Sequence, residues 1–168
     1  LNGAALSNRA GAKLINKGSL GLYNGVLRND GTLENRGTLE NFARVENRGD
    51  FSNYSSLTNQ NEVDNSGSFS NRGSFVNDSG TLANSAYFFS DGEVENSATI
   101  TNDLSFGNQG LIRNTSTGLI DNRFTMVMYG GGASNGILDN DVGGRITNSG
   151  MFSTFEVMES AFVSGAGS

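Results

Sequence analysis

The 168-residue chain contains no cysteine, histidine, proline or tryptophan. Without cysteine it can form neither a disulfide framework nor a thiolate metal site. Without histidine, Ser-His and Cys-His nucleophilic systems and most zinc sites are excluded. The absence of proline suits β-strands, because a strand inside a sheet must donate backbone hydrogen bonds to its neighbours.

Charge is also scarce in this chain. Only 17% of the residues are charged, the net charge is −6, and the only lysines are Lys13 and Lys17. A nucleic-acid partner calls for a basic stripe, so none is expected. No apolar run approaches the ~18–20 residues of a membrane helix, so no membrane insertion is expected. No cofactor or metal is expected either, and the calcium-binding nonapeptide pattern is missing.

What the chain does contain is a repeat of six residues. Positions 31–60 divide into GTLENR, GTLENF, ARVENR, GDFSNY and SSLTNQ, each with a large apolar residue third and an asparagine fifth. The apolar residues recur along most of the chain and are the expected core: Leu27, Leu33, Leu39, Val45, Phe51, Leu57, Val63, Phe69, Phe75, Leu82, Phe88, Val94, Ile100, Phe106, Ile112, Ile120, Leu138 and Ile146.

An asparagine follows two residues after nearly every apolar residue of this series. The asparagines are Asn29, Asn35, Asn41, Asn47, Asn53, Asn59, Asn65, Asn71, Asn77, Asn84, Asn96, Asn102, Asn108, Asn114, Asn122, Asn140 and Asn148. The residue two positions before the apolar one is usually glycine, and otherwise mostly alanine or serine. At the N-terminus the triplets Leu6-Ser7-Asn8, Leu14-Ile15-Asn16 and Leu22-Tyr23-Asn24 show the same spacing at looser intervals.

A period of six fits strands and not helices, because side chains alternate between the two faces of a strand. One face of each unit carries a small residue, a large apolar residue and an asparagine, and the opposite face carries polar residues. One such strand cannot bury its apolar face alone, whereas stacked coils can. The sequence therefore predicts an all-β, single-stranded parallel β-solenoid (β-helix). Disorder, the alternative for a chain rich in Asn and Gly, would not keep the apolar residues in register.

Stacking also explains the asparagines. Successive coils lie about 4.8 Å apart, so equivalent asparagines come to lie above one another and can pass amide hydrogen bonds along the stack. Glycine two positions before the apolar residue is expected to let the backbone turn and to leave room for the neighbouring apolar side chain. The expected product is an apolar ladder beside an amide ladder.

The period leaves the size of the coil open. Three units per coil give a triangular solenoid of 18 residues per turn and roughly nine coils, and two units give a flat coil of 12 residues and roughly fourteen coils. Three units are preferred, because one large residue per wall fills a triangular core. The handedness is not set by the sequence pattern.

Two segments depart from the repeat. Residues 123–136 contain Met126, with Met128 in place of the asparagine, and then three consecutive glycines, which is typical of a loop at a corner. An insertion tolerated at the corner is the preferred explanation, and a ligand-binding loop is the alternative. Residues 1–150 are assigned to the solenoid, and residues 151–168 to a non-repeat segment that covers the last coil or clasps another chain. The candidates for assembly contacts are Leu1, Leu6, Phe152, Phe155, Val157, Met158 and Phe162.

Chemistry based on carboxylates alone remains open, since glycosidases need only two acidic residues. The candidate pairs are Asp139 with Asp141 and Glu93 with Glu95, and neither pair has a basic partner in obvious register. A solvated outer face is the preferred explanation of both. An adhesive side should carry a cluster of exposed aromatic residues, but the outward Phe42 and Tyr54 are isolated in the sequence.

The recurring NRGTLENRGTLEN phrasing resembles the Asn- and Gly-rich β-solenoid repeats of large bacterial surface and secreted proteins, the filamentous-haemagglutinin-like adhesins and related autotransporter stalks. The resemblance covers about residues 6–148 and is specific for architecture more than for function. It implies an exported, extracellular or cell-surface protein with no enzymatic activity that forms a fibre, a stalk or a matrix.

Two main functions are expected from these observations. In the first, copies of the chain stack end to end as a homopolymer and build an extracellular filament or biofilm matrix, because the N-terminal residues enter the repeat without a capping segment. In the second, the chain is a stalk or binding segment of an adhesin whose sides bind a cell-surface glycan or another matrix component. A carbohydrate-active β-helix enzyme is the third and least favoured alternative.

Overall fold

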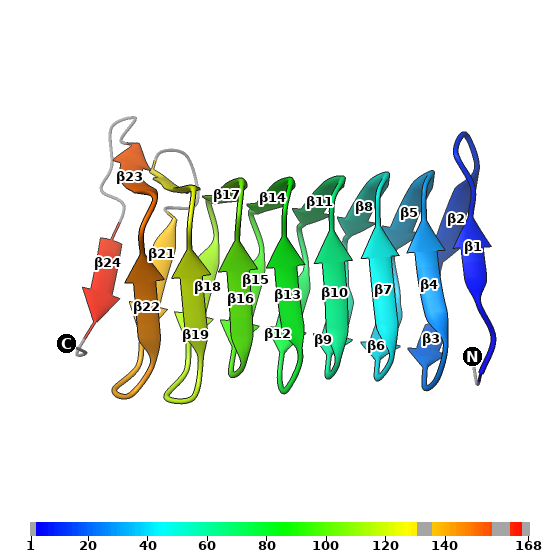
Figure 1. Ribbon diagram of the computed structural model, residues 1–168, viewed down its shortest axis with the longest axis horizontal. Helices are drawn as coiled ribbons and strands as arrows, with labels where there is room; N and C mark the ends of the chain where they lie inside the picture. Colours follow the sequence, from blue (N-terminus) through cyan, green and yellow to red (C-terminus); the bar gives the residue numbers. More distant parts are fainter. Residues whose placement is uncertain (1–2, 131–135, 156–161, 166–168) are drawn as a thin grey trace.

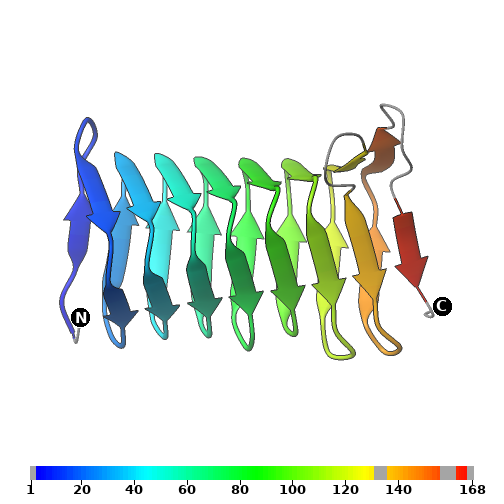
Figure 2. The same ribbon diagram turned by 180° about the vertical axis from the view of Figure 1, so that it is seen from behind.

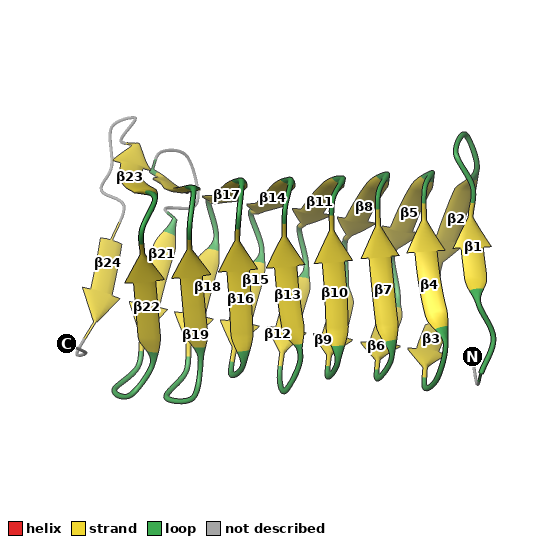
Figure 3. Cartoon of the chain, in the orientation of Figure 1, coloured by secondary structure: helices red, strands yellow, loops and turns green. Residues whose placement is uncertain are grey.

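In the computed structural model, residues 3–130, 136–155 and 162–165 are described. They form a solenoid of three eight-stranded parallel sheets that wrap around one core (Figure 1). The described residues contain strands, turns and bends and no helix (Figure 3). The predicted parallel β-solenoid with three strands per coil is confirmed, and the flat coil of 12 residues is excluded.

Consecutive strands belong to different sheets, and every third strand returns to the same sheet. Sheet A contains β1 (Leu6–Asn8), β4 (Val26–Asn29), β7 (Arg44–Asn47), β10 (Glu62–Asn65), β13 (Thr81–Asn84), β16 (Thr99–Asn102), β19 (Leu119–Asn122) and β22 (Arg145–Asn148). Sheet B contains β2 (Lys13–Asn16), β5 (Thr32–Asn35), β8 (Asp50–Asn53), β11 (Ser68–Asn71), β14 (Tyr87–Ser90), β17 (Ser105–Asn108), β20 (Thr125–Tyr129) and β23 (Met151–Phe155). Sheet C contains β3 (Ser19–Leu22), β6 (Thr38–Asn41), β9 (Ser56–Asn59), β12 (Ser74–Asn77), β15 (Glu93–Asn96), β18 (Leu111–Asn114), β21 (Ile137–Asn140) and β24 (Phe162–Gly165).

The coil length is 18 residues in the most regular part of the stack, where Leu27 pairs with Val45. Longer coils occur near both ends: Leu6 pairs with Leu27, and Ile112 pairs with Leu138. The described extra residues lie between the strands, and the strands stay in register. The extra residues also explain why the chain makes eight rungs per sheet, about 34 Å of stack, and not the nine coils expected from a uniform period.

The interior is a continuous apolar column. The expected core residues lie in it, and all of them except Ile146 are buried, with Ile146 packed partly buried against the column at the last coil. In sheet B the rings of Phe51, Phe69, Phe88 and Phe106 follow one another with centroids 4.4–5.0 Å apart. One large side chain from each of three walls fills each layer, which is why the three-walled coil accommodates phenylalanine in its core.

The handedness follows from the backbone hydrogen bonds. The N–H of the outward-facing Glu62 donates to the carbonyl of Ala43 in the preceding coil (3.2 Å), whereas the carbonyl of the inward-facing Asn47 accepts from Ser66 in the following coil (2.8 Å). For L-residues this arrangement is compatible only with a right-handed coil. Figure 1 agrees, because the strands of sheet A run upward on the near side while the coils advance away from the N-terminus, and Figure 2 shows the chain returning downward behind them.

Two local predictions were wrong. In the triplet Leu22-Tyr23-Asn24 the apolar position belongs to Leu20, which pairs with Leu39, so Leu22 stands where other coils have asparagine. The corner loop predicted for residues 123–136 begins later, because Thr125–Tyr129 forms strand β20 and Met128 lies fully buried in register with Asn108. In both places an apolar side chain replaces the amide without interrupting the sheet.

The C-terminal segment that departs from the repeat continues two sheets in its described part. Phe152 pairs with Met126, and Val163 takes the register position beside Leu138. Among the candidates for assembly contacts, Leu6 and Phe152 are partly buried against the end of the core. Leu1, Val157 and Met158 lie outside the described residues, and only the backbone is described for Phe155 and Phe162.

The expected role of glycine in turning the backbone fits Gly25, whose φ is +107°, but most corner glycines are explained differently. At Gly37 the backbone φ is not positive, and a Cβ atom would lie 2.1 Å from the carbonyl oxygen of Gly18 in the coil below. The neighbouring apolar side chain is not the constraint. The corner therefore needs glycine because the backbones of successive coils approach each other closely.

We expect Gly37→Ala to destabilise the protein by about 1–3 kcal/mol, because the added methyl group collides with a backbone atom that cannot rotate away. Gly18→Ala is the matched control, since it lies one coil lower on the same corner with no atom within 4 Å of its Cβ position. Thermal unfolding followed by circular dichroism measures both. Equal shifts in Tm for the two variants would contradict the close-approach explanation.

Candidate functional site

The amide ladder is the most extensive polar arrangement in the interior. The ladder asparagines are buried, apart from Asn16, which is half-buried at the first coil, and Asn148, which is exposed at the last coil. Sheet A carries the longest ladder, from Asn8 through Asn29, Asn47, Asn65, Asn84, Asn102 and Asn122 to Asn148. Asn8 and Asn16 extend the series of the regular repeat by one coil at the N-terminal end.

Every bond between ladder asparagines runs in the same direction. The Nδ2 group of each asparagine donates to the Oδ1 atom of the asparagine in the following coil, over 2.6–2.9 Å. The second N–H of Asn47 donates to the carbonyl of Ser68 (2.9 Å), also toward the following coil. Because both N–H groups are used on the same side, the amide cannot be turned over without losing both bonds.

Sheet B departs from this pattern in three coils. Ser90 replaces asparagine in β14 and accepts from Asn71 Nδ2 at 3.2 Å. In β20 Met128 offers only its sulfur, 3.7 Å from Asn108 Nδ2. Thr154 follows Met128 in register. The sequence shows Ser90 and Met128 directly, since each falls two residues after an inward apolar residue, Phe88 or Met126. Thr154 lies in the segment assigned outside the repeat, and only the strand register places it in this row.

We expect Asn47→Ala to lower the free energy of unfolding by about 1–3 kcal/mol, because the buried amides above and below lose a partner each. Asn148→Ala is the control at the exposed end of the same ladder and should cost less. Urea unfolding of both variants measures the difference. A cost for Asn148→Ala as large as that for Asn47→Ala would contradict the ladder's cooperative role.

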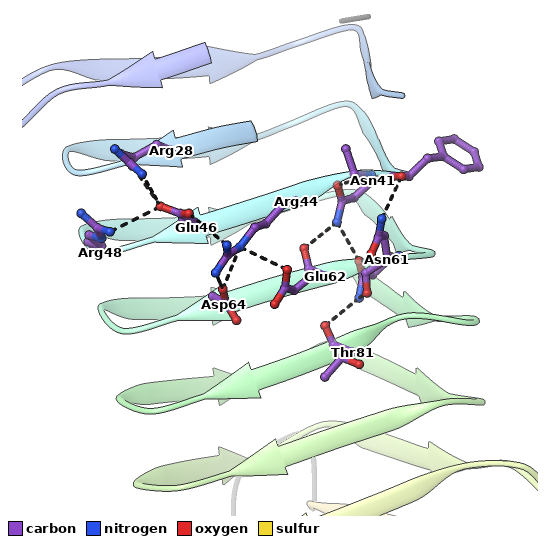
Figure 4. A network of polar contacts seen from close by, with 12 residues as sticks. Arg28, Asn41, Arg44, Glu46, Arg48, Asn61, Glu62, Asp64 and Thr81 are labelled. Atoms are coloured by element: carbon purple, nitrogen blue, oxygen red, sulfur yellow. Dashed lines mark hydrogen bonds and ion pairs between the residues drawn. The ribbon is translucent and has the colours of Figure 1, made fainter. Parts of the chain in front are cut away.

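The outer face of sheet A carries a cluster of ion pairs near the N-terminal end (Figure 4). Arg28 reaches Glu46 at 2.8 Å, and Arg44 reaches Glu62 at 3.1 Å and also bonds Asp64. The hydrogen bond from Arg28, with the nearby charges of Arg44 and Arg48, holds the pKa of Glu46 below its ordinary value. A general acid needs a raised carboxyl pKa, so this environment acts in the opposite direction.

We expect Arg44→Gln to change the free energy of unfolding by about 1 kcal/mol or less, since its side chain is 46% exposed and its ion pairs are screened by solvent. The effect should shrink further at high salt. Chemical unfolding at low and high ionic strength measures both. A loss that grows with salt would show that the cluster does more than neutralise the surface.

The carboxylate pairs singled out in the sequence lie on the outer face of sheet C or at its corner. Glu93 and Glu95 both point outward from β15, and the structure supplies the basic partner that the sequence seemed to lack. Arg113 lies in register between Glu95 and Asp139, and its guanidinium is 3.9 Å from Glu93. The expectation of no basic partner was wrong because residues 18 to 26 apart in sequence become neighbours in the stack.

The expectation of isolated aromatic residues was wrong for Phe42. Phe42 stacks on Tyr23 with centroids 5.2 Å apart, beside a shallow depression of about 230 Å³ that Arg44 and Glu62 border. Tyr54 lies between the guanidinium groups of Arg36 and Arg72, at 5.6 and 5.5 Å from its ring centroid. These contacts join residues of different coils, which are far apart in the sequence, so the sequence pattern did not reveal them.

No family model matches this chain, and no curated protein and no solved structure matches it. Within the described ranges there is no group of three or more acidic, histidine or cysteine residues that could hold a metal ion. The same residues include no helix long and apolar enough to cross a membrane. The assignment of a parallel solenoid with an asparagine ladder therefore rests on the strand pairing and the hydrogen bonds of the structure.

Proposed function

We propose that this protein is a non-enzymatic structural element that stacks end to end with further copies into an extracellular filament, of the fibre-forming kind its repeat resembles. The supporting observation is that the two ends of the stack carry matching rows of residues. No described segment pairs with the outer edges of β1, β2 and β3 or with those of β22, β23 and β24. Such edges are templates for strand addition.

Sheets A and B match at the amide rows. Asn148 at the last rung of sheet A carries amide donors, and Asn8 at the first rung presents Oδ1, which no donor from the described residues reaches. In sheet B, Thr154 carries a hydroxyl donor. Asn16 Oδ1 at the first rung accepts the N–H of Gly18 (3.2 Å) and retains a second lone pair. A copy placed on the C-terminal end would continue both ladders.

In sheet C the two end rungs match because neither has a polar side chain in the amide row. Its first rung has the buried Leu22 in the amide row, and its last described rung has Gly165 in that row. Neither residue brings a side-chain donor or acceptor to the junction. The inner row is apolar at both ends of all three sheets, with Leu6, Leu14 and Leu20 at the first rung and Ile146, Phe152 and Val163 at the last.

The direction of the amide ladder sets the polarity of stacking. A head-to-tail junction places Nδ2 donors against Oδ1 acceptors, whereas a head-to-head junction places acceptors against acceptors. Head-to-tail stacking is a heterologous contact that does not close, so it yields open filaments and not dimers. The extracellular setting rests on the resemblance of the repeat to bacterial surface and secreted proteins.

We expect the purified protein to form unbranched filaments of one polarity, seen by negative-stain microscopy. Leu6→Lys should abolish them while leaving the β-sheet spectrum unchanged, because the ammonium group is hydrated at a free end but is buried unpaired at a junction. Ser7→Lys is the control, because the same charge then lies on the outward face of the same strand.

Filaments of Leu6→Lys that equal those of the wild type would show that the first rung is not the junction. A folded wild-type protein that stays monomeric at high concentration would contradict end-to-end stacking altogether. The stalk of a surface adhesin would then be the better proposal, because it needs the same rigid solenoid without free ends.

A further inference from the structure

The outer face of sheet B changes character along the stack. Its N-terminal half carries charged residues such as Lys13, Glu34 and Asp50. Its C-terminal half has no charged residue at the outward positions of β14, β17, β20 and β23. These positions hold Tyr87, Phe89, Ser105, Gly107, Thr125, Val127, Tyr129, Met151 and Ser153, which together we call the aromatic face.

The centre of the aromatic face is a glycine covered by two rings. Gly107 lies on the outward side of β17 and is nevertheless buried. The rings of Phe89, one rung below, and Tyr129, one rung above, come within 3.1 and 3.0 Å of the place where its Cβ would lie. Their centroids are 6.1 Å apart. The missing side chain thus lets the two rings close over the strand and join into one surface across three rungs.

The rim of this surface is exposed and apolar. Tyr87 is 64% exposed, Met151 is 57% exposed and Tyr129 is 37% exposed. Large exposed apolar side chains gathered on one face of a protein mark an interaction surface. Hydroxyl groups accompany them at Ser105 and Thr125, in register beside Tyr87.

The aromatic rings and hydroxyl groups of the aromatic face match the chemistry of a sugar chain. Pyranose rings with equatorial hydroxyls have two apolar C–H faces, which stack on aromatic rings, and a polar rim, which bonds hydroxyl groups. Four rungs span about 14 Å, which suits several consecutive units of a chain better than a single sugar. The lack of charge at the outward positions disfavours an anionic polymer, which would seek arginine or lysine.

We propose that the aromatic face binds a neutral polysaccharide through the flat faces of its hexopyranose units. The face lies on the side of the solenoid and not at its ends. Binding therefore does not depend on filament formation, and either property can fail without the other.

Adsorption of the full-length protein to microcrystalline cellulose and to chitin tests this proposal, with the anionic polymer alginate, held as calcium-gel beads, as the comparison. The wild type should be retained on at least one neutral polymer, and the double variant Tyr87→Ser/Tyr129→Ser should bind about tenfold more weakly or worse. Tyr129→Phe should bind within about twofold of the wild type, since it keeps the ring. Tyr54→Ser, which removes the ring held between two arginines on another surface, should bind like the wild type.

Circular dichroism and thermal unfolding establish that each variant is folded. Absence of adsorption to both neutral polymers overturns the proposal, and so does tighter binding to alginate or an equal loss in Tyr54→Ser. Sedimentation velocity adds a further outcome. Lateral association of copies that the double variant abolishes, without polysaccharide adsorption, would assign the face to contacts between copies and reject the glycan.

Discussion

The structure depends on the requirement that a buried amide keep its hydrogen-bond partners. Each ladder asparagine places a polar group in the interior, where an unmatched donor or acceptor costs about 1–3 kcal/mol. That cost is avoided only if the next coil brings its own amide to the same height and the same wall, as Asn47 does between Asn29 and Asn65. The ladder therefore fixes the register of the coils, which the apolar residues alone would leave free to slip.

The ladder also gives the stack a direction. Both N–H groups of an interior amide such as Asn47 donate toward the following coil, so the two ends of the solenoid differ chemically although their backbones are alike. The end rungs keep this difference, with an amide oxygen at Asn8 and amide hydrogens at Asn148. Polarity is thus a property of the side chains that persists over the full length of the stack.

A fixed interior leaves the outer faces free to differ. On sheet A the outward positions carry opposite charges that pair between coils, as Arg28 does with Glu46. On sheet B the outward positions are uncharged from β11 onward, and aromatic residues appear there from β14. The same coils also lose the amide ladder at Ser90, Met128 and Thr154. In these strands of sheet B, both the inward amide row and the outward positions therefore depart from the repeat. The asparagine ladders of sheets A and C continue beside them and keep the coils in register.

The sequence by itself determined the strand period, the inward residues and the asparagine ladder, because each depends on spacing along the chain. The same spacing left the size of the coil open. Three strands per coil were only preferred, from the bulk of the apolar residues, and the pairing of every third strand decided it. The sequence could not place Leu22, because the first coils deviate from the period and only pairing with Asn41 shows which row the residue occupies.

The sequence also missed the stacking of Tyr23 on Phe42, the position of Arg113 between Glu95 and Asp139, and the closure of Phe89 and Tyr129 over Gly107. These are contacts between coils, whose partners lie 18 to 40 residues apart. Only the tertiary structure decided them, since loops of unequal length set which residues meet. The right-handed coil was likewise decided by the direction of backbone hydrogen bonds, which a pattern of side chains does not encode.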